Sequence, residues 1–381
     1  MPSAGRIQDI ERLRAIAALA VLIGHVPWLQ VGLSSLLQVR VDPWTGVDLF
    51  FVISGFVVSS AFERDLARAA GPSRAGAALG TFYRKRAARI LPTAYLGLAL
   101  WWIGAAWLNQ SGTWGPPLHG SAAAGMAASG LLLVSNYGQV FAGVTMPLFW
   151  YWSICVEEHF YLLYPAFRLI VGTRRRRVVT VLVTIAAVHV IRLLTHDPRA
   201  LDVLSHLRFD QLGLGVLIGL MRQQWAEAAS RAAARLRAPG WPRTAGVVSI
   251  LVLLLLLGVL PVTLLVDLTS NAARVGYPLA GALAAGIVLL ASADAGLLAF
   301  GRSRVGALLS MLGARSYGIY MFHVSALWIV VELRQRLFGD PGAAWLRAPE
   351  LIAYALVLGG MVELNYRRIE RPLIAWAARA R

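Results

Sequence analysis

Ten long apolar stretches dominate this chain, and most are close to the length that an α-helix needs to cross a bilayer. A transmembrane helix takes about 20 mostly apolar residues. Of the 381 residues, 58% are hydrophobic and only 14% are charged, whereas a soluble domain carries about 25% charged residues. The sequence therefore predicts an all-α fold, a polytopic membrane helical bundle of about ten transmembrane helices, in a single integral-membrane domain over residues 1–381. The predicted spans are 15–34, 46–62, 88–108, 147–171, 178–195, 208–221, 245–266, 276–295, 307–331 and 350–367.

The placement of basic residues orients this bundle. With the N-terminus in the cytoplasm, the predicted inner segments hold 28 of the 36 lysines and arginines, as the positive-inside rule requires. Membrane orientation thus explains the net charge of +17, and nucleic acid is not an expected partner. We predict a multi-pass protein of a bacterial inner membrane with both termini cytoplasmic. The apolar, small-residue stretch 121–134 is predicted to be a re-entrant or interfacial helix. If it spans the membrane instead, the count becomes eleven and the orientation of every later segment is reversed.

Arg14 and His25 distinguish the first apolar stretch from a simple lipid-facing span. Eleven helical residues make almost three full turns, so the two side chains share one face about 16 Å apart along the axis. Ionisable groups at bilayer depth are costly and tend to be functional, and an imidazole is a natural general base. The alternative is that Arg14 snorkels to the membrane surface and His25 is a hydrogen-bonded bundle histidine.

Carboxylates mark two further stretches. Asp48 opens the segment that begins at Gly46, where it can take part in the chemistry or simply cap the helix. Glu157 and Glu158 are adjacent inside an apolar span, where two carboxylates are costly. Since neighbouring residues lie about 100° apart on a helix, one glutamate can address the reacting groups while the other holds an arginine. The alternative is a structural buried ion pair.

Two more pairs share a helix face because their members are three residues apart. Arg86 and Arg89 offer two planar guanidiniums, which bind phosphate oxygens bidentately. Ordinary cytoplasmic flanking charge or contact with lipid head groups is the alternative. Tyr320 and His323 form the second pair, although a lone histidine is more often a packed polar residue than a catalyst.

Together these segments resemble the membrane acyltransferase-3 family. Each match alone is weak, whereas the ordered set spans nearly the whole chain and is specific. The matches are Arg14-x10-His25, GVDLFFVISGF from Gly46, the R-x-x-R of Arg86 and Arg89, WSICVEEHFYLLYP from Trp152, RFDQLGLG from Arg208, SYGIYMFH from Ser316, and the terminal Glu370-Arg371-Pro372.

The resemblance implies an O-acyltransferase that moves an acyl group, usually acetyl from acetyl-CoA, to a hydroxyl. Typical acceptors are carbohydrates or glycosylated natural products, such as cell-envelope polysaccharide, lipopolysaccharide and macrolide antibiotics. The chain resembles the stand-alone form of the family, without the C-terminal SGNH hydrolase-like domain. It departs from the family at His159, where glutamine is usual, and at Ser325, where proline is common.

The resemblance also suggests a role for each candidate residue, in one water-accessible pocket open to the cytosol. We expect acyl-CoA as co-substrate, membrane lipid around the bundle and no metal, because no histidine pair has zinc-ligand spacing. A membrane transporter or flippase is the rival interpretation, although no internal repeat of the kind common in transporters is present. The expected catalytic residues are His25 as base, Glu157 or Glu158 as its orienting partner, Tyr320 and His323 at the oxyanion, and Asp48; the expected CoA-phosphate ligands are Arg86 and Arg89, with Arg14.

Overall fold

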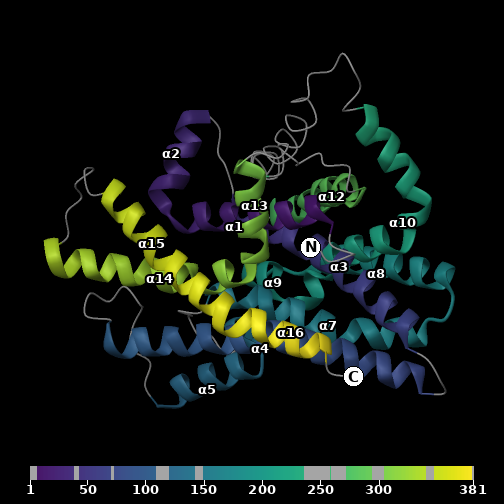
Figure 1. Ribbon diagram of the computed structural model, residues 1–381, viewed down its shortest axis with the longest axis horizontal. Coiled ribbons are helices and arrows are strands. Elements are labelled where there is room, and N and C mark those ends of the chain that lie inside the picture. The colour runs from purple at the N-terminus through teal and green to yellow at the C-terminus, as the bar shows by residue number, and fades with distance from the viewer. Residues whose placement is uncertain are drawn as a thin grey trace. The chain divides into compact units, whose positions relative to one another are not determined.

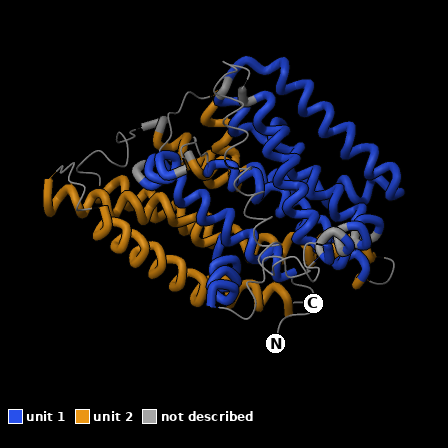
Figure 2. Tube along the Cα trace, turned by 90° about the horizontal axis from the view of Figure 1, so that it is seen from above, with its two compact units in different colours: residues 1–67, 156–316 blue, residues 68–155, 317–381 orange. Residues whose placement is uncertain are grey.

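The computed structural model is helical throughout the part of the chain that it describes, and no strand occurs there (Figure 1). By contacts between Cα atoms the chain divides into two compact units, each assembled from two separate segments (Figure 2). The first unit holds residues 1–67 and 156–316, and the second holds 68–155 and 317–381. The described residues are 7–37, 43–69, 73–108, 120–141, 149–235, 258, 272–293, 304–339 and 347–379.

The all-α prediction is confirmed, and several helices can cross a membrane. Five described helices are long and apolar enough to do so, or six if the bent pair at the N-terminus is one span. This protein is therefore a multi-pass membrane protein, while the count of ten, the single domain and the sides of the termini stay predictions. The predicted span 245–266 lies outside the described residues except for position 258. The five segments are Thr45–Arg68, Arg74–Trp107, Arg174–Leu194, Arg274–Ser292 and Ser316–Phe338.

The first predicted span, 15–34, is not one straight helix. Helix α1 ends at His25, helix α2 begins at Pro27, and the two axes differ by 103°. Between them Val26 is extended, with φ −111° and ψ 91°. A residue that precedes proline is pushed out of the helical region, and proline itself has no N–H to donate. His25 therefore lies at the end of a helix, not in its middle.

Within the first unit, α12 packs against both α1 and α10. Helix α1 contacts α13 and α12, and α10 contacts α8 and α12. A shared core of buried apolar side chains joins α1, α3, α10 and α12, including Leu13, Val52, Phe56 and Ala284. The bounds are α1 Gln8–His25, α2 Pro27–Leu37, α3 Thr45–Arg68, α7 Trp152–Ile170 from Val156 onward, α8 Arg174–Leu194, α9 Pro198–Val203, η2 Ser205–Leu207, α10 Phe209–Arg235, α12 Ala272–Ser292 and α13 Arg304–Ala314.

Two glycines bring α3 and α10 into backbone contact. A Cβ added at Gly55 would collide with the carbonyl of Leu212, and one added at Gly215 would collide with the carbonyl of Val52. Small residues allow this close approach, as is common between helices in membranes. The crossing holds the start of α10 against α3, which is where the polar residues of both helices meet.

The second unit is built on the long helix α4, against which α16 packs. The predicted span 307–331 is divided, because α13 ends at Ala314 and α14 begins at Ser316. The stretch 121–134, predicted as re-entrant or interfacial, overlaps helix α5, which runs from Gly120 to Leu131. The bounds are α4 Arg74–Trp107, α5 Gly120–Leu131, α6 Ser135–Phe141, η1 Phe149–Tyr151, α14 Ser316–Phe338, α15 Arg347–Asn365, η4 Tyr366–Glu370 and α16 Arg371–Arg379.

A single π-helical turn, η4, connects α15 to α16. Asn365 donates from Nδ2 to Oε1 of Glu370, five residues on, at 2.7 Å. A side-chain pair five apart would lie about 140° apart around an α-helix, so the wider turn is what lets them meet. Thr93 of α4 hydrogen-bonds to Asn365, and all three side chains are buried. These three side chains thus form a polar contact between α4 and the turn that joins α15 to α16.

Candidate functional site

His25 lies at the last residue of α1 with one ring nitrogen committed to the backbone. Its Nδ1 is 2.9 Å from the carbonyl oxygen of Val21. Because a carbonyl can only accept, Nδ1 carries the proton and the neutral ring has its lone pair on Nε2. Trp44 packs edge-on against the imidazole, with the ring centroids 4.2 Å apart. This fixed tautomer is the one that a general base working through Nε2 needs.

Glu157 is held by a hydrogen-bonded chain across two helices. Tyr161, one turn further along α7, donates from its hydroxyl to Oε2 of Glu157 at 2.6 Å. Because the single Tyr161 proton goes to the carboxylate, the hydroxyl of Ser54 on α3, 2.7 Å away, donates to the phenolic oxygen. Tyr161 and Ser54 are both buried. The chain orients one carboxylate oxygen and stabilises its charged form.

Asp48 is part of a buried ion pair in the first turn of α3. Nη2 of Arg208 lies 2.6 Å from Oδ1 of Asp48, and Nε2 of Gln211 donates to the same oxygen. The Arg208 guanidinium also stacks over the ring of Tyr277, 4.0 Å from its centroid. Asp48 and Arg208 are each no more than 4% exposed at the side chain. These contacts favour a positioning role for Asp48, and its predicted catalytic role stays a prediction.

Glu158 and His159 follow Glu157 on α7, and both are partly buried. Nδ1 of His159 lies 2.6 Å from the hydroxyl of Ser205 in the short helix η2. The residue at which the chain departs from the family pattern thus joins α7 to the segment before α10. A ring nitrogen of histidine can make this contact in place of a glutamine amide.

In the second unit, Tyr320 and His323 lie together on α14, as predicted. Their ring centroids are 5.5 Å apart, and Nδ1 of His323 donates to the carbonyl of Tyr320. The Tyr320 hydroxyl donates to the carbonyl of Trp150 at 3.0 Å. Since that donor is then used, Ser153 donates to the Tyr320 oxygen at 2.6 Å. His323 is completely buried.

The predicted phosphate ligands are partly exposed. Arg86 and Arg89 lie one turn apart on α4, and the Arg86 guanidinium sits 5.5 Å from the ring centroid of Phe82. Arg14, on α1 of the first unit, pairs with Glu11 at 3.8 Å.

The predicted residues are divided between the two units. Five belong to the first unit, and four, including the Tyr320–His323 pair, belong to the second. Within the described ranges, no three His, Cys, Asp or Glu side chains cluster as metal ligands. The residues of the first unit are Arg14, His25, Asp48, Glu157 and Glu158; those of the second are Arg86, Arg89, Tyr320 and His323.

Sequence reasoning missed several residues that hold the candidates in place. Tyr161 could have been found, because its four-residue spacing from Glu157 puts the two on one helix face. Ser153 and Arg208 lie inside segments that carry the family resemblance, but their partners are 167 and 160 residues away in the chain. Nothing in a single sequence pairs residues so distant.

Comparisons with known proteins find one matching family model and several relatives. A family model described as an acyltransferase domain matches residues 7–362. YrhL of Bacillus subtilis, named as a candidate peptidoglycan O-acetyltransferase, is 26% identical over 96% of this chain and 55% of its own length. The peptidoglycan O-acetyltransferase OatA of Listeria monocytogenes is 26% identical over 43% of this chain and 24% of its own. The chain thus spans about half or less of the length of these relatives. No solved structure matches it.

Proposed function

This chain belongs to the acyltransferase-3 family, and we propose that it transfers an acetyl group from acetyl-CoA to a carbohydrate hydroxyl at the membrane. Family membership supports acyl transfer, and the names of the relatives support an O-linked acetyl product. The acyl-CoA donor and the acceptor are the proposed parts. One observation carries the assignment of the base: the carbonyl of Val21 fixes the proton of His25 on Nδ1.

In the proposed reaction His25 takes the proton of the acceptor hydroxyl on Nε2. The hydroxyl oxygen attacks the thioester carbonyl, a C–O bond forms, and the C–S bond breaks. The imidazolium then returns its proton to the departing CoA thiolate, so atoms and charges balance. General base catalysis of this kind contributes about 10²- to 10⁴-fold.

The other candidates are proposed to support this step. The Glu157 carboxylate, held by Tyr161, stabilises positive charge as the imidazole is protonated. Tyr320 and His323 are proposed to stabilise the oxyanion of the thioester carbonyl. Arg86 and Arg89, with Arg14, are proposed to bind the phosphates of CoA, because each is a partly exposed arginine and a guanidinium bonds phosphate oxygens bidentately.

The acceptor is proposed from the relatives alone. Both named relatives act, by name, on peptidoglycan, a polymer of sugars with acylatable hydroxyls. A cell-envelope glycan is therefore the first acceptor to test, ahead of lipopolysaccharide or a macrolide. This chain covers at most 55% of the length of those proteins, so the acceptor is inferred only from the part of each relative that matches it.

The experiment uses membranes that contain the full chain, labelled acetyl-CoA and cell-wall glycan. His25→Ala should lower acetylation by about 10²-fold or more. His206→Ala is the matched control, because His206 is an exposed histidine outside the candidate set. Normal acetylation by His25→Ala would refute the base assignment. Movement of glycan across the membrane without acetyl-CoA consumption would favour a transporter.

A further inference from the structure

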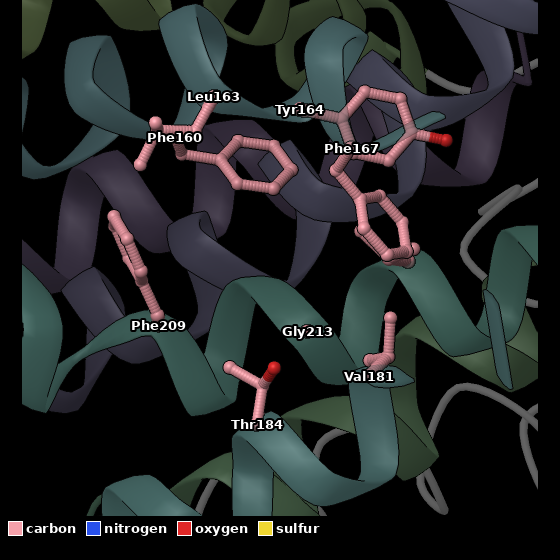
Figure 3. Close-up of a pocket in the computed structure, with 9 residues that line it drawn as sticks. Phe160, Leu163, Tyr164, Phe167, Val181, Thr184, Phe209 and Gly213 are labelled. Carbon is pink, nitrogen blue, oxygen red and sulfur yellow. The ribbon is translucent and has the colours of Figure 1, made fainter. Parts of the chain in front are cut away.

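A cavity of about 200 Å³ lies in the first unit between α7, α8 and α10, and its lining includes none of the candidate residues above (Figure 3). Its walls are almost entirely apolar, with aromatic rings from α7 and from Phe209 of α10 and aliphatic side chains from all three helices. It is smaller than the roughly 300–1,000 Å³ of pockets that hold drug-sized ligands. The lining includes Phe160, Tyr164 and Phe167 of α7, Val181 of α8, and Gly213 and Val216 of α10.

The cavity opens on an exposed apolar surface of α7 and α8. Leu163 lines it and is 57% exposed, and Val183 on α8 is 61% exposed. Helix α8 is long and apolar enough to cross the membrane, yet only 22% of its most apolar window is buried by protein. Such a face meets lipid chains in a bilayer. A narrow apolar cavity there suits a segment of one alkyl chain and would leave the hydroxyls of a sugar without partners.

One end of the cavity is strongly cationic. Phe167 on α7 is followed directly by Arg168, and Val181 on α8 lies one turn after Arg177. Both arginines bind the same carboxylate, Glu63 of α3, through Arg168 Nη2 at 3.0 Å and Arg177 Nη1 at 2.9 Å. Figure 3 shows Phe167 and Val181 at the same end of the cavity. Two guanidiniums therefore share a single negative charge at this end.

Arg174 adds a third guanidinium on the same face of α8, three residues before Arg177. Its Nε donates to the carbonyl of Leu220 at 2.8 Å, one turn beyond the cavity residue Val216 of α10. Its Nη2 is buried and has no hydrogen-bond partner among the described residues. Since α8 begins at Arg174, the positive end of its dipole reinforces the charge. Because the buried Nη2 donor of Arg174 lies in a region with an excess of positive charge, this end of the cavity favours binding of an anion.

We propose that this cavity binds one anionic phospholipid of the bilayer. An alkyl chain fills the apolar walls, and the phosphate contacts Arg174 beside the Arg168–Glu63–Arg177 group. The charge complementarity and the position of the cations at one end of the apolar cavity select this amphiphile over a neutral lipid. Basic pockets between membrane helices bind acidic head groups by the same physics.

The test is lipid retention by the purified full chain, measured by native mass spectrometry after addition of phosphatidylglycerol or phosphatidylcholine with identical chains. The wild type should retain phosphatidylglycerol preferentially. Arg174→Gln should weaken that retention about tenfold. Arg176→Gln is the matched control, because Arg176 is exposed and lies about 200° around the helix from Arg174. Thr184→Phe, which fills the cavity from an exposed position on α8, should also weaken retention.

Three results would overturn the proposal. Equal retention of the two lipids by the wild type would show that the site does not select an anionic head group. Equal losses in Arg174→Gln and Arg176→Gln would show general surface charge and no defined site. Unchanged lipid retention in Thr184→Phe would show that the alkyl chain does not lie in the cavity. If the wild type is a dimer that this substitution dissociates while lipid is still retained, the cavity binds a second copy of the protein. Gel filtration of each variant confirms that the protein is folded before lipid is added.

Discussion

The phenolic hydroxyl of Tyr161 lies between the Glu157 carboxylate, 2.6 Å away, and the Ser54 hydroxyl, 2.7 Å away. This one side chain connects α7 to α3 and fixes the rotamer of a glutamate that the sequence marks as catalytic. A residue that orients a charged group should matter for turnover more than for binding of the donor.

Tyr161→Phe removes the hydroxyl and keeps the ring. We expect kcat for acetyl transfer to fall about tenfold with KM for acetyl-CoA nearly unchanged, because one charge-assisted hydrogen bond is lost. Steady-state rates with labelled acetyl-CoA measure both. Tyr95→Phe is the control, since the Tyr95 hydroxyl donates only to the carbonyl of Leu131 in the contacts described. Unchanged kcat in Tyr161→Phe would show that Glu157 does not depend on this chain.

Arg86→Ala should act on the donor. We expect KM for acetyl-CoA to rise about tenfold, since a bidentate guanidinium–phosphate contact would be lost, with a smaller effect on kcat. Arg74→Ala, an exposed arginine in the first turn of the same helix, removes an equal charge and should leave KM within about twofold. An equal rise in both variants would point to general attraction of CoA to a basic surface.

Asp48→Leu should destabilise the fold because it leaves the Arg208 guanidinium buried without its carboxylate. Breaking one partner of a buried pair costs about 3–5 kcal/mol. The double variant Asp48→Leu with Arg208→Met removes both charges and should recover a large part of that loss. Thermal unfolding of the detergent-purified protein gives the comparison. No recovery in the double variant would mean that the pair is not the main source of the effect.

Gly55→Ala tests the close crossing of α3 and α10. The added methyl would collide with the Leu212 carbonyl, so we expect a loss of about 1–3 kcal/mol in stability, as in other overpacked sites. At Gly286 of α12 a methyl meets nothing within 4 Å, so Gly286→Ala should be neutral or stabilising by up to about 1 kcal/mol. A Gly55→Ala protein as stable as the wild type would mean that the two helices can separate without cost.

Hydropathy and charge were enough to predict a helical membrane protein, because long apolar stretches have few alternatives in a bilayer. The break after His25 was visible only as Pro27 inside a continuous apolar stretch, which hydropathy does not register. The Glu157–Tyr161 pair follows from helical spacing and could have been read from the sequence. The Asp48–Arg208 pair could not, because its partners are 160 residues apart and meet only when α3 and α10 pack.

The π-turn between α15 and α16 makes the helical phase of the C-terminus depend on chain length. Deleting one residue between Tyr366 and Glu370 would place the glutamate four residues after Asn365, where ordinary α-helical winding already brings the two side chains onto one face. Adding one residue there would instead carry the Glu370 carboxylate away from Asn365 and Thr93 and turn the face of α16 that packs on α4 by about 100°. One-residue deletions in this turn should therefore be tolerated far better than one-residue insertions.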